Sequence, residues 1–164
     1  MKKLIYYSGG TKMKSKLISI LFILFIFCSC VSYPPTTFVK TYDEPGMWKS
    51  IEIKDGIDKT NLWRTIVDAL TQQFDLEVLD KDSGYLRTSW KYTYIQQGLV
   101  NQNYRSRIVL KFVGDDWKVV QVKCESNWLQ TGGFGAAGWI LGYDSKLLED
   151  VYGDLQGRVG RIRR

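Results

Sequence analysis

Histidine is absent from this chain of 164 residues, and cysteine is rare, with three residues in all. The lack of histidine removes the side chain that most often acts as a general base or metal ligand near neutral pH. So few cysteines argue against a small secreted fold held together by disulfides. A long hydrophobic run is also missing, because Leu17–Phe27 is interrupted by Ser19 and is shorter than the about 18 apolar residues that span a bilayer.

The segment Lys14–Cys30 carries the strongest targeting pattern in the sequence. Lys14 and Lys16 precede the apolar run Leu17–Phe27, and Ser29 places a small residue directly before Cys30. This pattern resembles a bacterial lipoprotein signal peptide. The resemblance implies cleavage before Cys30 and acylation of that cysteine, which becomes the first residue of the mature protein. The alternative, an uncleaved membrane anchor, requires a longer apolar run.

The predicted signal peptide defines three segments: a leader over residues 1–29, a tether over 30–47 that is rich in threonine and proline, and a single domain over 48–164. Met13 is a second candidate start, and with that start residues 1–12 would be an extension without a structural role. Residues 1–29 contain five lysines and no acid, so their removal lowers the formal net charge from +6 to +1. A nearly neutral domain outside the cytoplasm argues against binding to nucleic acid.

Hydrophobic periodicity within residues 48–164 predicts strands and two helices. The first helix begins at Asp58 or Thr60 and has apolar positions from Leu62 to Phe74 at helical spacing. The second begins at Asp144 or Ser145. Alternation of apolar and polar residues predicts strands over Ser50–Lys54, Leu76–Asp80, Tyr85–Tyr94, Tyr104–Val113 and Trp117–Trp128, with Gln96–Asn103 and Leu129–Gly142 left without regular structure.

This order of strand, helix, strands and helix predicts an α+β domain in which an antiparallel sheet carries two helices on one face. Asn61–Trp90, with a tryptophan early in the helix and a strand that ends Thr88-Ser89-Trp90, followed by Tyr104-Arg105-Ser106-Arg107, resembles the helix-grip domain of the BamC lipoproteins. Those lipoproteins belong to the outer-membrane β-barrel assembly machinery. The BamC family has two such domains, whereas this chain has one, so the resemblance implies a fold more directly than a role.

Several motifs are better explained by structure than by catalysis. Gly133–Gly138 matches the spacing G-x-G-x-x-G, but no second strand of a dinucleotide-binding unit follows it. Cys124 lies on an apolar strand face without a histidine partner, which predicts a buried, unreactive thiol. Asp80 and Asp82, like Asp115 and Asp116, lie in predicted turns, where aspartate hydrogen-bonds the backbone. We therefore expect no catalytic residue, no metal and no cofactor.

Because successive side chains of a strand point to opposite faces of the sheet, a set of basic residues is predicted to lie on the side away from the core. Apart from Glu125, no acid stands at a fixed spacing from them, so we expect their charge to be mostly uncompensated. The alternatives for this face are a solvated surface or a binding surface for an acidic partner or anionic headgroups. The candidate binding residues are Arg87, Lys91, Arg105, Arg107, Lys111 and Lys123.

These patterns predict a non-enzymatic lipoprotein of the bacterial outer membrane that faces the periplasm and binds an envelope protein. A role in outer-membrane assembly or maintenance is the further expectation. The alternative is a small lipid or amphiphile carrier with a pocket lined by Trp63, Trp90 and Trp128 between helix and sheet. Trp63 and Trp90 are both predicted to lie in the core.

Overall fold

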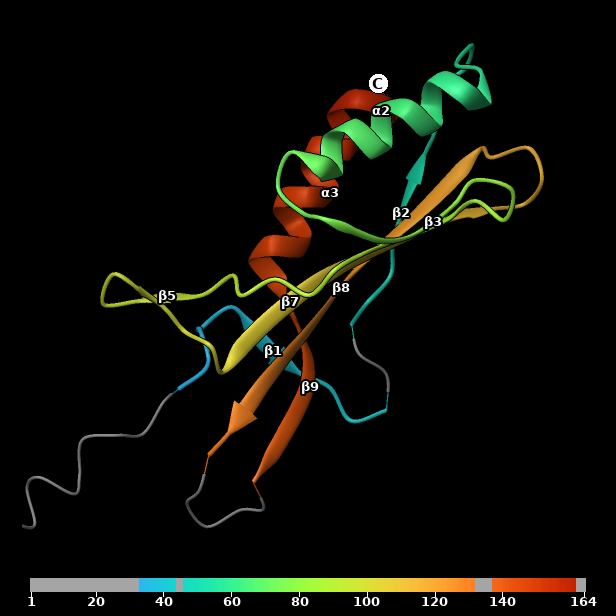
Figure 1. Ribbon diagram of the computed structural model, residues 1–164. Helices are drawn as coiled ribbons and strands as arrows, with labels where there is room; N and C mark the ends of the chain where they lie inside the picture. Colours follow the sequence, from blue (N-terminus) through green and yellow to red (C-terminus); the bar gives the residue numbers. More distant parts are fainter. Residues whose placement is uncertain (1–32, 44–45, 132–136, 162–164) are drawn as a thin grey trace, which may run out of the picture. The chain divides into compact units, whose positions relative to one another are not determined.

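The computed structural model describes residues 33–43, 46–131 and 137–161. The predicted signal peptide, Cys30 and most of the Gly133–Gly138 motif lie outside the described residues. The unit Pro34–Arg164 is compact by itself. It contains an antiparallel sheet, a separate hairpin and two helices, which confirms the α+β class (Figure 1).

Seven strands form the main sheet, in the spatial order β1-β9-β8-β7-β4-β3, with β2 paired to β8 beside this path. The hairpin β5–β6 forms a second sheet of two strands. Every strand pair is antiparallel. The strands are β1 (Phe38–Lys40), β2 (Lys49–Glu52), β3 (Leu76–Asp80), β4 (Tyr85–Thr88), β5 (Ile95–Gln96), β6 (Leu99–Val100), β7 (Tyr104–Val113), β8 (Val119–Gln130) and β9 (Gly138–Asp144).

Both helices begin at aspartate caps. The Asp58 carboxylate accepts hydrogen bonds from the backbone amides of Thr60 and Asn61 at the start of α2 (Lys59–Thr71). Asp144 accepts one from the amide of Leu147 at the start of α3 (Ser145–Val159). Each bond satisfies an amide that has no partner within the helix.

Apolar side chains of both helices and of the sheet form one hydrophobic cluster, which includes Trp63 and Leu155 together with Ile108 and Val122. The prediction that both helices pack on one face of the sheet is not confirmed. α3 lies against β2, β8 and β9, whereas the most extensive contact of α2 is with α3. Periodicity identifies the apolar side of a helix but does not say which element covers it.

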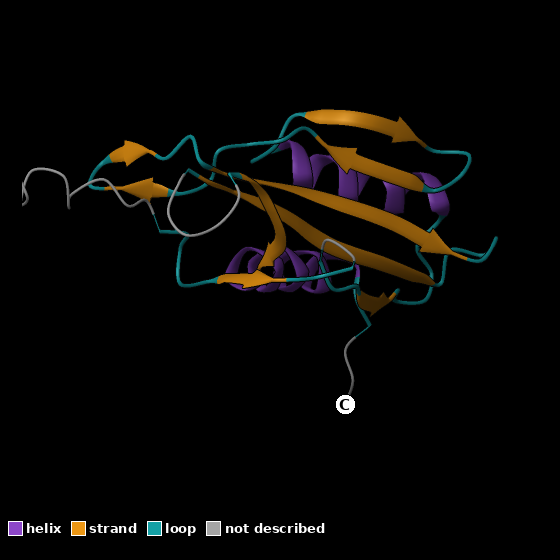
Figure 2. Cartoon of the chain, turned by 90° about the horizontal axis from the view of Figure 1, so that it is seen from below, coloured by secondary structure: helices purple, strands orange, loops and turns teal. Residues whose placement is uncertain are grey.

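Three segments predicted to lack regular structure contain strands. Residues 38–40 of the predicted tether form β1, which pairs with β9, and Phe38 packs on Tyr104. The predicted loop over residues 96–103 contains part of the β5–β6 hairpin, which extends beyond the main sheet (Figure 2). The glycine-rich stretch over 129–142 contributes most of β9. Short strands of two to seven residues depend on their neighbours in the fold more than on their own periodicity.

β2 and β9 share the outer edge of β8: β2 pairs with residues 119–122, and β9 pairs with 126–130. Gly46 lies against Cys124, in the part of β8 between these two paired segments. It has a φ of 90°, and a Cβ atom there would lie 2.2 Å from the carbonyl oxygen of Cys124. Only glycine fits this approach, which brings the chain close to β8 just before Trp48.

Candidate functional site

β7 and β8 present their alternate side chains to two different environments. Ile108 and Leu110 point into the hydrophobic cluster, whereas Arg105, Arg107 and Lys111 point to the other side. We call this second side the arginine–tryptophan face. It consists of Trp48, Glu77, Arg87, Trp90, Arg105, Arg107, Lys111, Lys123, Glu125 and Trp139.

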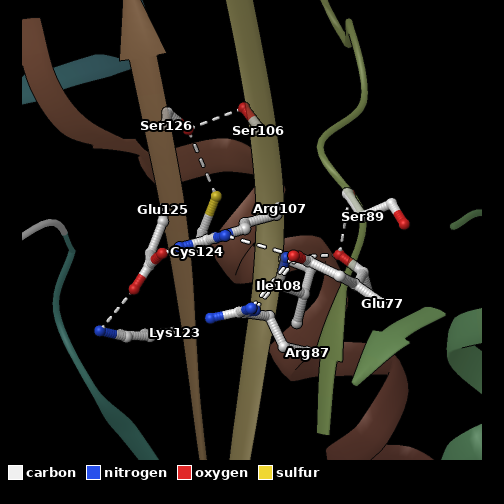
Figure 3. Close-up of polar contacts among 11 residues, drawn as sticks. Glu77, Arg87, Ser89, Ser106, Arg107, Ile108, Lys123, Cys124, Glu125 and Ser126 are labelled. Atoms are coloured by element: carbon white, nitrogen blue, oxygen red, sulfur yellow. Dashed lines mark hydrogen bonds and ion pairs between the residues drawn. The ribbon is translucent and has the colours of Figure 1, made fainter. Parts of the chain in front are cut away.

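Glu125 on β8 pairs with two cations of this face, Arg107 and Lys123 (Figure 3). Its carboxylate oxygens lie 2.7 Å from Arg107 Nε and 2.6 Å from Lys123 Nζ, and its side chain is only 7 % exposed. Burial by itself raises the pKa of Glu125, but the hydrogen bonds from Lys123 and Arg107 outweigh burial and hold the pKa below its ordinary value. The carboxylate is therefore ionised at neutral pH and compensates two cations.

Glu77 on β3 is a second acid on this face (Figure 3). It accepts two hydrogen bonds of 3.1 Å from Arg87 and lies 3.6 Å from Arg107 Nη1. Arg107 therefore links the two carboxylates. The prediction of mostly uncompensated charge is wrong for Arg87 and Arg107. Lys123 is also paired, with Glu125. The pairing of β3 with β4, with its register shift between Leu76 and Val78, brings Glu77 beside Arg87.

Tryptophan rings cover the cations of this face. The guanidinium carbon of Arg105 lies 4.6 Å from the ring centre of Trp90 and 4.3 Å from that of Trp139. Arg107 also stacks on Trp90, at 4.3 Å. Distances of this order are typical of cation–π contacts, which favour a planar guanidinium over an aromatic face.

Trp48 covers the opposite part of the face. Its ring centre lies 4.6 Å from Lys111 Nζ and 4.9 Å from Lys123 Nζ. Sequence reasoning did not identify Trp48, because it precedes the predicted strand. In the sheet Lys49 pairs with Val122, and this pairing places Trp48, the residue before Lys49, beside Lys123.

The prediction that Trp90 lies in the core is wrong, and an irregularity after β4 explains why. Arg87 pairs with Val109, whereas Lys91 pairs with Ser106, so this side of the ladder contains one additional residue. Such a bulge exchanges the two faces for every residue that follows it. At the bulge the Thr88 hydroxyl accepts the hydrogen bond of the Ile108 amide, at 2.9 Å.

The same bulge removes Lys91 from the predicted cationic face. Lys91 Nζ lies 5.5 Å from the ring centre of Phe74 and donates to the Gln73 carbonyl. Of the six candidate binding residues, the structure thus brings five together, and the five are Arg87, Arg105, Arg107, Lys111 and Lys123.

These five cations face two carboxylates, which leaves a formal excess of three positive charges. Within the described part of the chain, Arg105 and Lys111 have no carboxylate partner. Arg105 Nε is buried without a hydrogen-bond acceptor among the described residues, so an external anion can reach only the terminal amino groups of this guanidinium. The Arg105 guanidinium, fixed between two indoles, is therefore the group on this face that is best prepared to bind an external anion.

The other candidate groups have structural roles. The prediction of a buried thiol at Cys124 is confirmed: burial raises its pKa to about 11, and Sγ lies 3.5 Å from the Ser126 hydroxyl (Figure 3). Asp80 accepts hydrogen bonds from the amides of Asp82 and Ser83, as expected for a turn. No group of three or more potential metal ligands occurs among the described residues.

The three tryptophans predicted to line a carrier pocket do not lie together. Trp63 packs against Phe112 and Trp117 in the core, at 6.2 and 5.8 Å between ring centres. Trp90 stacks on arginines on the other side of the sheet. A pocket between helix and sheet that uses both side chains is incompatible with this arrangement.

Comparison with known proteins gives no family: no protein-family model and no curated protein matches the chain. Neither α2 nor α3, the helices of the described residues, is long and apolar enough to cross a membrane.

Proposed function

We propose that this protein is a non-enzymatic lipoprotein of the bacterial cell envelope. In this proposal, acyl chains on Cys30 anchor it to the outer membrane, and the domain faces the periplasm and binds an acidic protein through the arginine–tryptophan face. The supporting observation is Arg105, which lies between Trp90 and Trp139 with no carboxylate partner among the described residues. A helix-grip relationship to the BamC lipoproteins remains part of the proposal.

The chemistry of this face suits a protein partner. Arginine and tryptophan are enriched among the residues that contribute most to protein–protein affinity. With Nε buried, the terminal N–H groups of the Arg105 guanidinium are the ones available for a carboxylate, which can accept two of them in parallel. Because stacking already restricts the Arg105 side chain, less conformational entropy is lost when the partner binds.

Charge reversal tests this surface. In cells of the native host, Arg105→Glu should reduce photo-cross-linking to an acidic envelope protein by at least about tenfold at low salt, because it replaces attraction with repulsion at the binding group. The matched control is Arg64→Glu, an identical change on the exposed side of α2. The difference between the variants should shrink in 1 M salt, where the Debye length is about 3 Å. If the cross-link persists with Arg105→Glu at low salt, the partner binds elsewhere.

Anchoring is tested separately with Cys30→Ser. This change should abolish incorporation of labelled fatty acid, since acyl chains contribute about 0.8 kcal/mol of membrane affinity per buried methylene group. Cys28→Ser is the control and should retain labelling. Labelling that survives in Cys30→Ser would refute the lipoprotein assignment and leave the binding face untouched.

A further inference from the structure

The segment Tyr92–Asn103 contains no charged residue, although 24 % of the chain is charged. At its centre β5 and β6 form a hairpin, in which Ile95 pairs with Val100 and Gln96 with Leu99. Gln97 and Gly98 form its turn with φ values of 51° and 79°, the left-handed backbone that a two-residue hairpin turn requires. The segment is thus an ordered projection with an uncharged surface.

Three large apolar side chains of this hairpin are exposed to solvent. Ile95 is 65 % exposed, Leu99 75 % and Val100 56 %. The hairpin is not part of the main sheet, so these side chains contribute nothing to the core. Ile95 and Val100 lie opposite each other on one face of the hairpin and Leu99 lies on the other, so both faces of the projection carry exposed apolar groups. Exposed apolar groups gathered in this way indicate an interaction site.

Aromatic packing and hydrogen bonds fix the base of the hairpin. Tyr94 packs edge-on against Tyr104 at 5.9 Å, and Tyr104 packs against Phe38 of β1 at 5.7 Å. The amide of Asn101 donates to the Tyr94 carbonyl at 2.8 Å. The hairpin therefore projects from the same end of the domain at which the chain enters β1 (Figure 2).

The chain between Cys30 and Phe38 restricts where this end lies. About eight residues span at most about 28 Å when fully extended. An acyl anchor at Cys30 would thus hold β1, and with it the base of the hairpin, near the bilayer.

We propose that the β5–β6 hairpin docks on the membrane, with Ile95, Leu99 and Val100 inserted into the interface of a phospholipid bilayer. This inference rests on the proposed anchoring at Cys30. Tyr92, 47 % exposed, is placed to lie at the level of the headgroups, as interfacial tyrosines do. A lipid anchor and a docked hairpin together restrict the rotation that an anchor alone permits.

The test uses the chain from Pro34, which is a compact unit with its own core. A histidine tag before Pro34 attaches it to phosphatidylcholine–phosphatidylglycerol vesicles that contain a nickel-chelating lipid, in place of the acyl anchor. An environment-sensitive fluorophore is placed on Leu99→Cys or, as control, on Leu79→Cys, which is 52 % exposed on β3. The buried Cys124 thiol should remain unlabelled.

We expect a blue shift at position 99 and quenching by lipid-borne nitroxide at least about fivefold stronger than at position 79. Without the tag, Leu99→Gln with Val100→Thr should lower binding to the same vesicles by at least about tenfold. Leu79→Gln with Val113→Thr should leave binding unchanged. Equal quenching at the two positions overturns the inference. So does a blue shift that needs no vesicles and grows with protein concentration, which would show that a second copy covers the hairpin.

Because the tag replaces the acyl chains, these outcomes are independent of lipidation. Fatty-acid labelling at Cys30 combined with no insertion at position 99 refutes the docking hairpin alone. Insertion at position 99 without labelling refutes the anchor alone.

Discussion

The two sides of β7 and β8 share one backbone but differ in what stabilises them. On the core side, Ile108, Leu110 and Val122 are completely buried and gain free energy from the apolar area removed from water. On the arginine–tryptophan face, Arg107 and Glu125 are mostly buried as well, yet their burial is tolerable only because each charge has a partner. The core side is therefore sensitive to changes of shape, and the other side to changes of charge.

The largest expected effect separates two tryptophans that sequence reasoning had treated alike. Trp63→Ala should lower the free energy of unfolding by about 3 to 5 kcal/mol, because it removes a side chain that contacts Phe112 and Trp117 in the core. Trp90→Ala should cost only about 1 to 2 kcal/mol, since it removes cation–π contacts from a half-buried face. Urea denaturation measures both values, and equal losses would mean that Trp90 is a core residue after all.

The difference between these tryptophans shows where the sequence is informative. Alternation predicted β3 and β7 with their observed bounds, and Asp58 and Asp144 were among the predicted helix caps. Local patterns of this kind depend only on neighbours along the chain. The bulge after Thr88 has no such pattern, and it reversed the assignment of Trp90 and Lys91.

The candidate site was predictable in its cations but not in their partners. Arg105, Arg107 and Lys111 follow the period of one long strand. Glu77 and Trp48, in contrast, come from segments that only the pairings β3–β4 and β2–β8 bring to this face. Sequence spacing does not reveal contacts between strands that are distant in the chain.

A second prediction concerns the carboxylate of Glu125. Glu125→Gln keeps the shape of the side chain but leaves Arg107 and Lys123 without their shared carboxylate, so it should destabilise the domain by about 2 to 3 kcal/mol. Asp68→Asn, which also removes one negative charge but lies on the exposed side of α2, is the control for a general effect of net charge on stability. A loss below about 0.5 kcal/mol for Glu125→Gln would show that solvent already compensates the two cations.

The difference in unfolding free energy between the parent protein and Glu125→Gln should depend on pH in a definite direction. Because the pKa of Glu125 is below its ordinary value in the folded protein, its stabilisation is complete above the unfolded-state pKa of about 4.3. The stabilisation is lost as the pH falls through the lower folded-state pKa. The difference in unfolding free energy between the parent protein and Glu125→Gln should therefore be constant near neutral pH and narrow below about pH 4.

A third prediction separates two arginines on β7. Arg107→Glu should lower the unfolding free energy by about 1.5 to 2 kcal/mol, because it places a third carboxylate beside Glu77 and Glu125. Arg105→Glu should cost about 1 kcal/mol or less, since no carboxylate among the described residues faces it and only its stacking is lost. Thermal melts of the two variants at equal ionic strength measure which substitution destabilises the domain more. A larger loss of stability for Arg105→Glu than for Arg107→Glu would mean that Arg105 stabilises the fold, and it would weaken the case for Arg105 as a binding group.

The smallest expected effect is at the exposed edge of the same face. Arg87 and Glu77 form two hydrogen bonds of 3.1 Å, but their side chains are 29 % and 41 % exposed. Water therefore screens this pair more than it screens Arg107 and Glu125. A double-mutant cycle with Arg87→Ala and Glu77→Ala should give a coupling energy of about 0.5 kcal/mol that falls in 1 M salt. The equivalent cycle with Arg107→Ala and Glu125→Ala should give a larger coupling that salt changes little, since its carboxylate is almost completely buried. Equal couplings would mean that burial does not grade the strength of these ion pairs, and that the face acts as a single network joined through Arg107.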